Sequence, residues 1–300
     1  MSSEPKVCAV TGAHGFVGSR MMHRLQRDGW RVIAWTRSPE PGTDAVAFRL
    51  GQEVDAGRFK GVHALVHCAY DFSPLSWDDI TAINVIGSEK LLRAARIAGV
   101  PSVVVLSSLS AFEGCRSLYG QAKLRIEDIA RTNGALVIRP GLVYGDDSGG
   151  MFGRLVGQVR NSRLIPVLWG GRQLQYLVQE EDLGNLVQGC LNGRVPAGTG
   201  PISVAHEQGW ELKEVLALIG RALGKRLFFV PVPWQCVWLG LKSLELAGAR
   251  PNFKSDSVIS IIYQNPAPSF ALLRSLGFQC RPYQATIPHG VGDMPHDLSK

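Results

Sequence analysis

The feature that most constrains the fold of this chain is a glycine-rich turn between a strand-like run and a helix-like run. Val7–Thr11 is short and apolar, as buried strands are, and Phe16–Asp28 carries its apolar residues on one side of a helix. Gly12, Gly15 and Gly18 lie at the junction with GxxGxxG spacing. Such a turn lets the backbone and the N-terminus of the helix approach a diphosphate. We therefore predict a dinucleotide-binding turn at this point.

The first half of the chain alternates between short apolar runs and amphipathic runs. Strands are expected at 32–35, 64–67, 103–106 and 136–138, and helices at 78–98 and 119–130. Alternation of this kind indicates parallel pairing, so the predicted fold class is α/β, a Rossmann-type doubly wound parallel sheet. After residue 140 the alternation ends, which predicts a smaller, mainly helical C-terminal substrate-binding cap. We expect 1–140 and about 175–205 to form the NAD(P)-binding domain, and about 141–174 and 206–300 the cap.

The composition is that of an ordinary globular chain with an excess of cations. Lys and Arg number 32 against 25 Asp and Glu, which gives a formal net charge of +7. These charges are scattered, so the expected partners are anionic small molecules and not nucleic acid. The six cysteines form no CxxC pair, which favours a reduced, cytoplasmic protein without a metal site.

One long apolar stretch lies in the expected cap. Residues 230–248 are rich in tryptophan and leucine, but prolines and charged residues interrupt them and they are too short to span a bilayer. The helix expected at 234–246 is therefore interpreted as buried in the cap, as part of a substrate pocket, or as a surface for a partner.

The residues after the second strand bear on the choice of dinucleotide. An NAD-specific site normally places an acid there to accept hydrogen bonds from the ribose hydroxyls. This chain has Thr36, Arg37 and Ser38 instead. An arginine at this point can bind the 2′-phosphate of NADP, with Ser38 or Thr36 adding a hydroxyl. NADP is therefore the predicted cofactor, with NAD as the alternative.

A serine, a tyrosine and a lysine are candidates for proton transfer. Tyr119 and Lys123 are four residues apart in an expected helix and so share one face. The ammonium group favours the phenolate, and we expect it to lower the pKa of the tyrosine. Ser108 could hydrogen-bond a substrate oxygen, but Ser107 competes because strand alternation turns only one of them toward the cofactor. Asn84 either holds a water near the lysine or is a buried hydrogen-bond partner.

These motifs, in this order, resemble the extended short-chain dehydrogenase/reductases of the NAD-dependent epimerase/dehydratase type. Further matching segments are ALVHCA at 64–69, INVIGS at 83–88, SSLSAFEG at 107–114 and RPGLVYG at 139–145. The second serine is the catalytic one in that pattern, so the resemblance implies catalytic roles for Ser108, Tyr119, Lys123 and Asn84. Together with the residues after the second strand, it implies cofactor contacts at Gly12, Gly15, Phe16, Val17, Gly18, Arg37, Ser38, His67, Ala69, Tyr119 and Lys123.

One departure from the family pattern concerns the substrate. Members that act on sugar nucleotides often carry an arginine seven residues before the position of Asp182, and this chain has Gln175 there. Arg154, Arg160 or Arg163 would have to replace it, which weakens the nucleotide-sugar interpretation.

The leading interpretation is an oxidoreductase that transfers a hydride between NADP(H) and a carbonyl or secondary alcohol. The substrate would be a small carbonyl compound or a nucleotide-linked sugar. One alternative is an NAD-dependent sugar-nucleotide epimerase, and another, of a different class, is a non-catalytic dinucleotide-binding assembly factor or sensor. The resemblance also implies a homodimer formed through helices 78–98 and 119–130.

Overall fold

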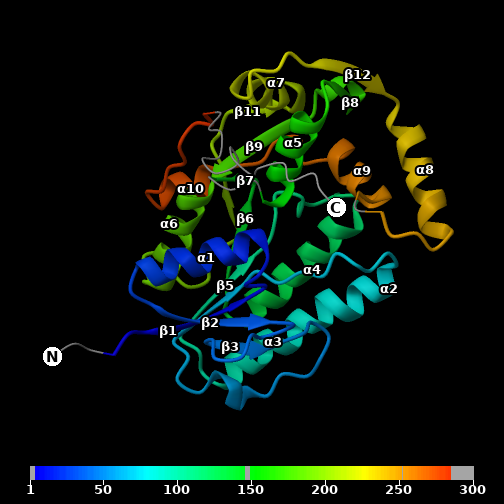
Figure 1. Ribbon diagram of the computed structural model, residues 1–300. Coiled ribbons are helices and arrows are strands. Elements are labelled where there is room, and N and C mark those ends of the chain that lie inside the picture. Colours follow the sequence, from blue (N-terminus) through cyan, green and yellow to red (C-terminus); the bar gives the residue numbers. More distant parts are fainter. Residues whose placement is uncertain (1–3, 146–148, 252, 285–300) are drawn as a thin grey trace, which may run out of the picture.

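The centre of the molecule is a seven-stranded sheet in which all neighbouring strands are parallel (Figure 1). The computed structural model describes residues 4–145, 149–251 and 253–284. The strands are β1 (Val7–Thr11), β2 (Arg31–Thr36), β3 (Ala45–Ala47), β4 (Ala64–His67), β5 (Ser102–Leu106), β6 (Leu136–Pro140) and β10 (Ile202–Val204). Their order is β10-β6-β5-β4-β1-β2-β3. The predicted α/β class and doubly wound sheet are confirmed, with β3 and β10 as edge strands that the sequence pattern did not predict.

Helices cover both faces of this sheet. One face packs against α1 (Phe16–Arg27), α6 (Glu180–Leu191) and α10 (Ala271–Ser275), and the other against α3 (Ile86–Ile97) and α4 (Leu118–Thr132). Met21 and Leu25 of α1 are buried with Leu183 of α6 on the first face. Because both faces are covered, β4 is buried at every position, and its first three residues form a continuous apolar run.

The helix expected at 78–98 is interrupted. It consists of α2 (Trp77–Ile80), a π-helical turn η2 (Thr81–Val85) and α3. A π-helical turn inserts an extra residue into the helical repeat and is frequent at functional sites. Asn84 lies within this turn and is fully buried.

Two small sheets lie outside the central sheet, and β9 (Leu174–Gln179) belongs to one of them although we expected residues from about 175 in the NAD(P)-binding domain. A three-stranded sheet has the order β11 (Gly209–Glu211), β9, β7 (Leu142–Tyr144), and β8 (Leu164–Leu168) pairs in parallel with β12 (Phe228–Val232). The helices of the cap are α5 (Gly150–Asn161), α7 (Leu212–Ala222), α8 (Trp234–Leu246) and α9 (Ser255–Ile262), and short 3-10 turns are η1 (Ala56–Phe59) and η3 (Trp169–Gly171). Its strands make the cap less helical than we expected. Residues 285–300 of the expected cap lie outside the described residues.

The helix α8 differs from its predicted environment. None of its residues is buried, although Trp238 on its inner side lines a cavity. The expectation that this helix is buried in the cap is therefore wrong, whereas its place in a pocket wall is found. Within the described ranges, no helix combines the length and apolar character needed to cross a bilayer.

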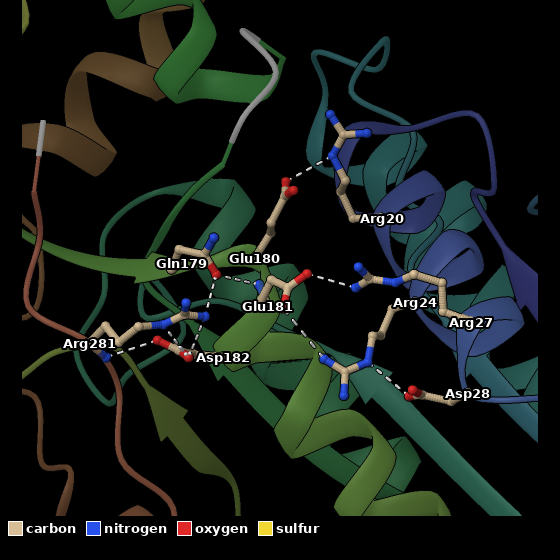
Figure 2. Close-up of polar contacts among 9 residues, drawn as sticks. All are labelled: Arg20, Arg24, Arg27, Asp28, Gln179, Glu180, Glu181, Asp182 and Arg281. Carbon is tan, nitrogen blue, oxygen red and sulfur yellow. Dashed lines mark hydrogen bonds and ion pairs between the residues drawn. The ribbon is translucent and has the colours of Figure 1, made fainter. Parts of the chain in front are cut away.

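Ion pairs join α1 to α6 beside the glycine turn. The helix α6 begins with three acidic residues, which suit the partial positive charge at a helix N-terminus. Figure 2 shows Arg20, Arg24 and Arg27 of α1, and Arg281 from the C-terminal segment, directed at these acids, with Arg24 at 4.0 Å from Glu181. The other pairs are Arg20–Glu180 at 2.8 Å, Arg27–Glu181 at 2.6 Å and Arg281–Asp182 at 2.9 Å. The pairs made by Arg20 and Arg27 hold the helix of the dinucleotide turn against an element more than 150 residues later in the sequence, and Arg281 ties the C-terminal segment to the same element.

Candidate active site

The glycine turn forms a cradle that no side chain could enter without displacing backbone. Gly12 has a φ of +66°, and a Cβ there would lie 2.8 Å from the backbone nitrogen of Ala69. A Cβ on Gly18 would lie 2.1 Å from the carbonyl oxygen of Gly12. Gly15 is the N-cap of α1 and, among the described residues, no side chain caps it. The N–H groups at this helix start are therefore suited to the pyrophosphate of a dinucleotide.

The other residues expected around the cradle lie beside it in different ways. The backbone of Ala69 faces Gly12 across the narrow space just described. Phe16 packs against Gly149 and Gly150, where added Cβ atoms would lie within 3 Å of its ring. Val17 is partly buried and packs against the sheet. Ala69, Phe16 and Val17 thus shape the rim and floor of the cradle.

The end of β2 presents a cation and no acid. Arg37 and Ser38 are exposed directly after this strand. The hydroxyl of Thr36 is buried and lies 3.2 Å from Nδ1 of His14, so it is engaged within the protein. Burial raises the pKa of the Asp71 carboxyl, but hydrogen bonds from Ser73 and the positive charge of Arg37 outweigh this and lower it overall. The positive charge of Arg37 therefore helps to stabilise the carboxylate of Asp71, in the loop that follows β4.

A buried chain of hydrogen bonds connects the cradle to the π-helical turn. The backbone N–H of Ala69 donates to Oγ1 of Thr11 at 3.3 Å, and this oxygen lies 2.7 Å from Nδ1 of His67. Nε2 of His67 lies 2.9 Å from Oγ of Ser88, and that hydroxyl donates to the carbonyl oxygen of Asn84 at 2.6 Å. Burial, and next the charge of Lys123, lower the pKa of His67 to about 3. His67 is thus a neutral link inside the protein, with both ring nitrogens engaged.

The side chain of Asn84 holds the loop after β4. Its Oδ1 accepts from the backbone N–H of Asp71 at 2.7 Å, and its Nδ2 donates to the carbonyl oxygen of Asp71 at 2.9 Å. Both polar atoms of the Asn84 amide therefore bind backbone atoms of one residue, Asp71. Of the two interpretations drawn from the sequence, these contacts favour the buried hydrogen-bond partner over the water-holding residue.

The two adjacent serines face different surroundings. Ser107 is buried and donates to Glu127, whose carboxylate also pairs with Arg139 at 2.8 and 2.5 Å. Ser108 instead lines the cavity beside Tyr119, and its hydroxyl acts to lower the pKa of that tyrosine. The structure thus brings Ser108 next to the tyrosine and turns Ser107 away from it. Glu127 was not singled out in the sequence, although it follows Lys123 by four residues on the same helix face.

Tyr119 and Lys123 lie close together with opposite pKa shifts. Nζ of Lys123 lies 6.0 Å from the centre of the Tyr119 ring and donates to the carbonyl oxygen of Leu106 at 2.8 Å. Burial raises the pKa of Tyr119 to about 12, against a smaller lowering by Ser108. The pKa of Tyr119 is therefore raised, where we expected Lys123 to lower it, and burial is the larger cause. Burial lowers the pKa of Lys123 to about 8, opposed by Cys68 and Glu127.

Two aromatic rings frame the tyrosine. The ring of Tyr70 meets that of Tyr119 edge-on at 5.0 Å, and Phe72 stacks on it at 5.6 Å although Phe72 itself is largely exposed. Lys254 of the cap fixes their loop, because its ammonium donates to the carbonyl oxygens of Phe72, Ser73 and Pro74. The sequence offered no signal for this contact, since loop and lysine are about 180 residues apart.

The cap also holds the start of the helix that carries Tyr119. Oδ1 of Asp256 accepts from the backbone N–H of Leu118 at 2.7 Å, and Oδ2 accepts from that of Tyr119 at 3.1 Å. Ser117 is the N-cap and accepts from the N–H of Gly120 at 3.1 Å. The first turn of α4 is therefore held by one local side chain and by one from the cap.

A cavity of about 550 Å³ opens beside Ser108 and Tyr119. Most residues in its wall are apolar, among them Leu109, Leu142, Leu155, Trp238 and Ile259. The charged residues of the wall mainly hold protein backbone: Asp71 binds Ser73, Lys254 binds the loop after β4, Glu245 binds Ser255, and Asp256 binds α4.

Arginines do not contribute to this wall as the structure describes it. Arg154, Arg160, Arg163 and Arg172 all lie outside the residues that line the cavity. At the position of the expected diphosphate-binding arginine, Gln175 lines the cavity and donates to Gln264 at 3.3 Å.

The chain combines a parallel Rossmann sheet and a cap with a tyrosine at the cavity and a lysine four residues later on the same helix. This combination defines the extended short-chain dehydrogenase/reductases. Residues 8–187 match the model of the NAD dependent epimerase/dehydratase family, and the chain belongs to that family. It is an NAD(P)-dependent oxidoreductase of this class.

Similar proteins include both lipid and sugar-nucleotide enzymes. A ceramide reductase of Caulobacter vibrioides is 28% identical over 238 residues, covering 76% of this chain and 74% of that protein. A dTDP-4-dehydro-6-deoxy-D-allose reductase from a Streptomyces species is 27% identical over 269 residues, covering 71% and 81%. The structure of MoeE5 in complex with UDP-glucuronic acid and NAD superposes with a TM-score of 0.72 at 21% identity, covering 93% and 94%.

Proposed function

We propose that this protein is an NADPH-dependent reductase that converts a carbonyl group of an apolar substrate to a secondary alcohol. The observation that carries the proposal is a tyrosine beside a serine at a largely apolar cavity. A phenol with an ordinary pKa near 10 already keeps its proton at neutral pH, and burial raises the pKa of Tyr119 further, to about 12. A group in this state is suited to donate a proton, which is the requirement of carbonyl reduction.

In the proposed reaction the residues of the chain have separate roles. When bound, the nicotinamide dinucleotide supplies the hydride. Tyr119 donates a proton from its hydroxyl to the carbonyl oxygen of the substrate, and Ser108 donates a hydrogen bond to the same oxygen as negative charge develops. Lys123 holds the nicotinamide ribose, and its ammonium favours the loss of the proton from the tyrosine during the reaction. Asn84 acts through the loop after β4, as a positioning residue.

The proposed cofactor is NADP(H). An exposed arginine after β2, with no acid there to accept from the ribose hydroxyls, supports this choice. Arg37 would bind the 2′-phosphate as a charge-assisted donor, and Ser38 would add its hydroxyl. Thr36 is not assigned, because its hydroxyl lies against His14.

The side chains of the cavity wall that are free to contact a ligand support an apolar substrate. The charged side chains of the wall mainly hold backbone, so Ser108 and Tyr119 are the polar groups best placed for a substrate oxygen. Most of the remaining wall is apolar and suited to hydrocarbon. A ceramide reductase among the similar proteins acts on a lipid, which agrees with this chemistry. A nucleotide-linked sugar is the second candidate, supported by MoeE5 and by the Streptomyces reductase.

The test is a turnover assay with both substrate classes and both cofactors. The purified protein is given NADPH or NADH, together with a long-chain keto lipid in detergent or a dTDP-4-keto sugar, and consumption of the reduced cofactor is followed. We expect turnover with the keto lipid and a preference for NADPH. Turnover with the sugar nucleotide alone would overturn the apolar substrate. Tight dinucleotide binding without turnover on any carbonyl would favour a non-catalytic sensor or assembly factor.

A further inference from the structure

The two-stranded sheet of the cap has an apolar face toward the solvent. Leu164 of β8 lies opposite Phe228 of β12, and Pro166 lies opposite Val230. All four side chains are exposed, Leu164 to 62% and Phe228 to 53%. A sheet with one face in water normally places polar residues on that face. This face has none at these four positions, so water is not the environment that it fits best.

The helix α8 continues this apolar surface. Its charged residues face the cavity and most of its leucines face the solvent, which is the reverse of the usual arrangement. After Pro233, β12 leads directly into α8 along the outer edge of the cap (Figure 1). Lys242 and Glu245 are the charged residues of this helix, and both lie on the side that lines the cavity. Leu239 and Leu246 are on the outside and are 61% and 78% exposed. A surface helix of a globular protein normally turns its charges outward.

Cations surround the apolar surface. The segments 163–172 and 225–250 contain four arginines (Arg163, Arg172, Arg226 and Arg250), two lysines and one acid, Glu245. Of the lysines, Lys242 lies on the cavity side and Lys225 donates to the carbonyl oxygens of Val159 and Arg160, so the arginines are the cations left for the outer surface. The acid is nearly buried and holds Ser255, so it adds little negative charge outside. The guanidinium of Arg226 lies 5.9 Å from the centre of the Phe228 ring, at the edge of the apolar face. Trp169, exposed at the other end of β8, adds an amphipathic ring.

We propose that this surface docks on an anionic lipid bilayer. We define the docking face by its exposed apolar residues, Leu164, Pro166, Phe228, Val230, Leu239, Leu244 and Leu246. Apolar residues framed by cations are the pattern of proteins that lie in the headgroup region of anionic membranes. The 13 residues of α8 are too few to span a bilayer, so the helix lies along its surface.

A bilayer fits the docking face better than a second copy of the chain. In a two-fold symmetric dimer the same surface of both copies meets, so the surrounding cations of each would approach those of the other. Anionic headgroups remove this repulsion. The docking face also lies on the outer side of the helix whose inner side lines the cavity, which would bring the cavity close to membrane lipid. The proposal goes beyond the proposed function and does not depend on it, because vesicle binding is measured without turnover.

The test is flotation of the full-length protein with vesicles. Vesicles of phosphatidylcholine alone are compared with vesicles that also contain phosphatidylglycerol, at low and high salt. We expect the protein to float with the anionic vesicles, and less so at high salt because screening weakens the attraction. The variant Val230→Glu/Leu239→Glu should bind at least about tenfold more weakly, since each charge opposes burial of the docking face. Dinucleotide binding and circular dichroism show that the variant is folded.

Ile97→Glu is the matched control. Ile97 is 68% exposed on α3, outside the docking face, so this variant gains the same charge as either single substitution, Val230→Glu or Leu239→Glu, and should float like the unchanged protein. Failure of the unchanged protein to bind anionic vesicles would overturn the proposal. Equal binding by the double variant and the control would overturn it as well. A dimer in sedimentation analysis that only the double variant converts to monomer would identify the face as a subunit interface instead.

Discussion

Asp256 of the cap and Tyr119 of the Rossmann domain are joined through the backbone of α4. The carboxylate of Asp256 accepts hydrogen bonds from the N–H groups of Leu118 and Tyr119, at 2.7 and 3.1 Å. These N–H groups belong to the first turn of a helix, where no carbonyl of the same helix can accept from them. The position of the candidate proton donor thus depends on a side chain 137 residues later in the sequence.

Removing this contact should impair both stability and turnover. Asp256→Ala leaves two N–H groups of α4 without their acceptor, and we expect the free energy of unfolding to fall by about 1–2 kcal/mol, as for the loss of a helix cap. Because Tyr119 lies on the loosened turn, kcat should fall more than KM rises. Asp256→Asn keeps one acceptor and should restore part of kcat. Thermal melts and steady-state kinetics measure these effects, with the exposed Asp128→Asn on the same helix as control. Normal kcat in Asp256→Ala would contradict the positioning role.

Tyr119→Phe should remove the proposed proton donor and leave the cofactor site intact. General acid catalysis contributes about 10²–10⁴-fold to a rate, so kcat should fall by at least about a hundredfold. The affinity for NADPH should hardly change, since the ring and its contacts with Tyr70 and Phe72 are kept. Stopped-flow kinetics and a binding titration test the two parts separately. Near-normal turnover in the variant would show that another group donates the proton.

The two adjacent serines provide a matched pair of variants. Ser108→Ala should lower kcat by about 10²–10³-fold, the range for loss of one donor to a developing oxyanion, with little change in stability. Ser107→Ala removes a donor to the buried carboxylate of Glu127 and should lower the free energy of unfolding by about 1–3 kcal/mol. Its kcat/KM should stay close to that of the unchanged protein. Kinetics and denaturant unfolding measure both effects. A large loss of kcat in Ser107→Ala, with normal kcat in Ser108→Ala, would show that Ser107 is the catalytic serine.

Arg37→Ala tests the choice of cofactor. Charge-assisted hydrogen bonds are worth about 1.5–3 kcal/mol, so loss of those to a 2′-phosphate should weaken NADPH binding about tenfold to a hundredfold. NADH lacks this phosphate, and its affinity should change little. Calorimetric titration of both cofactors measures the difference. Equal losses for the two would remove Arg37 from the 2′-phosphate site.

His67 should make the folded state less stable in acid. Its pKa is about 3 in the folded protein and near 6.5 when unfolded, so between these values the unfolded chain binds more protons. Stability is therefore lost as the pH falls below about 6.5, by up to about 1.4 kcal/mol per pH unit. In His67→Gln this part of the pH dependence should be absent, whereas the exposed His23→Gln should keep it. Urea unfolding at several pH values measures the slopes, and parallel curves for His67→Gln and the unchanged protein would argue against this account.

The elements set by short-range patterns could be predicted from the sequence. The glycine turn, the alternation of strands and helices, and the shared helix face of Tyr119 and Lys123 all depend on residues a few positions apart. Periodicity and turn chemistry act at this range, and the family model extends over the same segments. The π-helical turn around Asn84 could not be predicted, because the buried contacts of Asn84 with Asp71 form across a loop.

The surroundings of the two serines and the pKa of Tyr119 depend on contacts between segments that are distant in the sequence. Alternation showed that only one serine could face the cofactor, and the family resemblance chose Ser108. The contact that turns Ser107 away, with a carboxylate of Glu127 that also binds Arg139, is known only from the folded chain. The raised pKa of Tyr119 depends on burial, which is a property of the assembled site and not of the neighbouring lysine.

The sequence by itself determined the parallel sheet, the dinucleotide turn and the positions of the tyrosine and lysine, because local periodicity specifies them. Only the tertiary structure decided that Asp256 holds the first turn of α4 and that α8 turns its leucines outward. Both depend on packing between distant segments, since a helix has no inner side until a neighbour covers one of its faces.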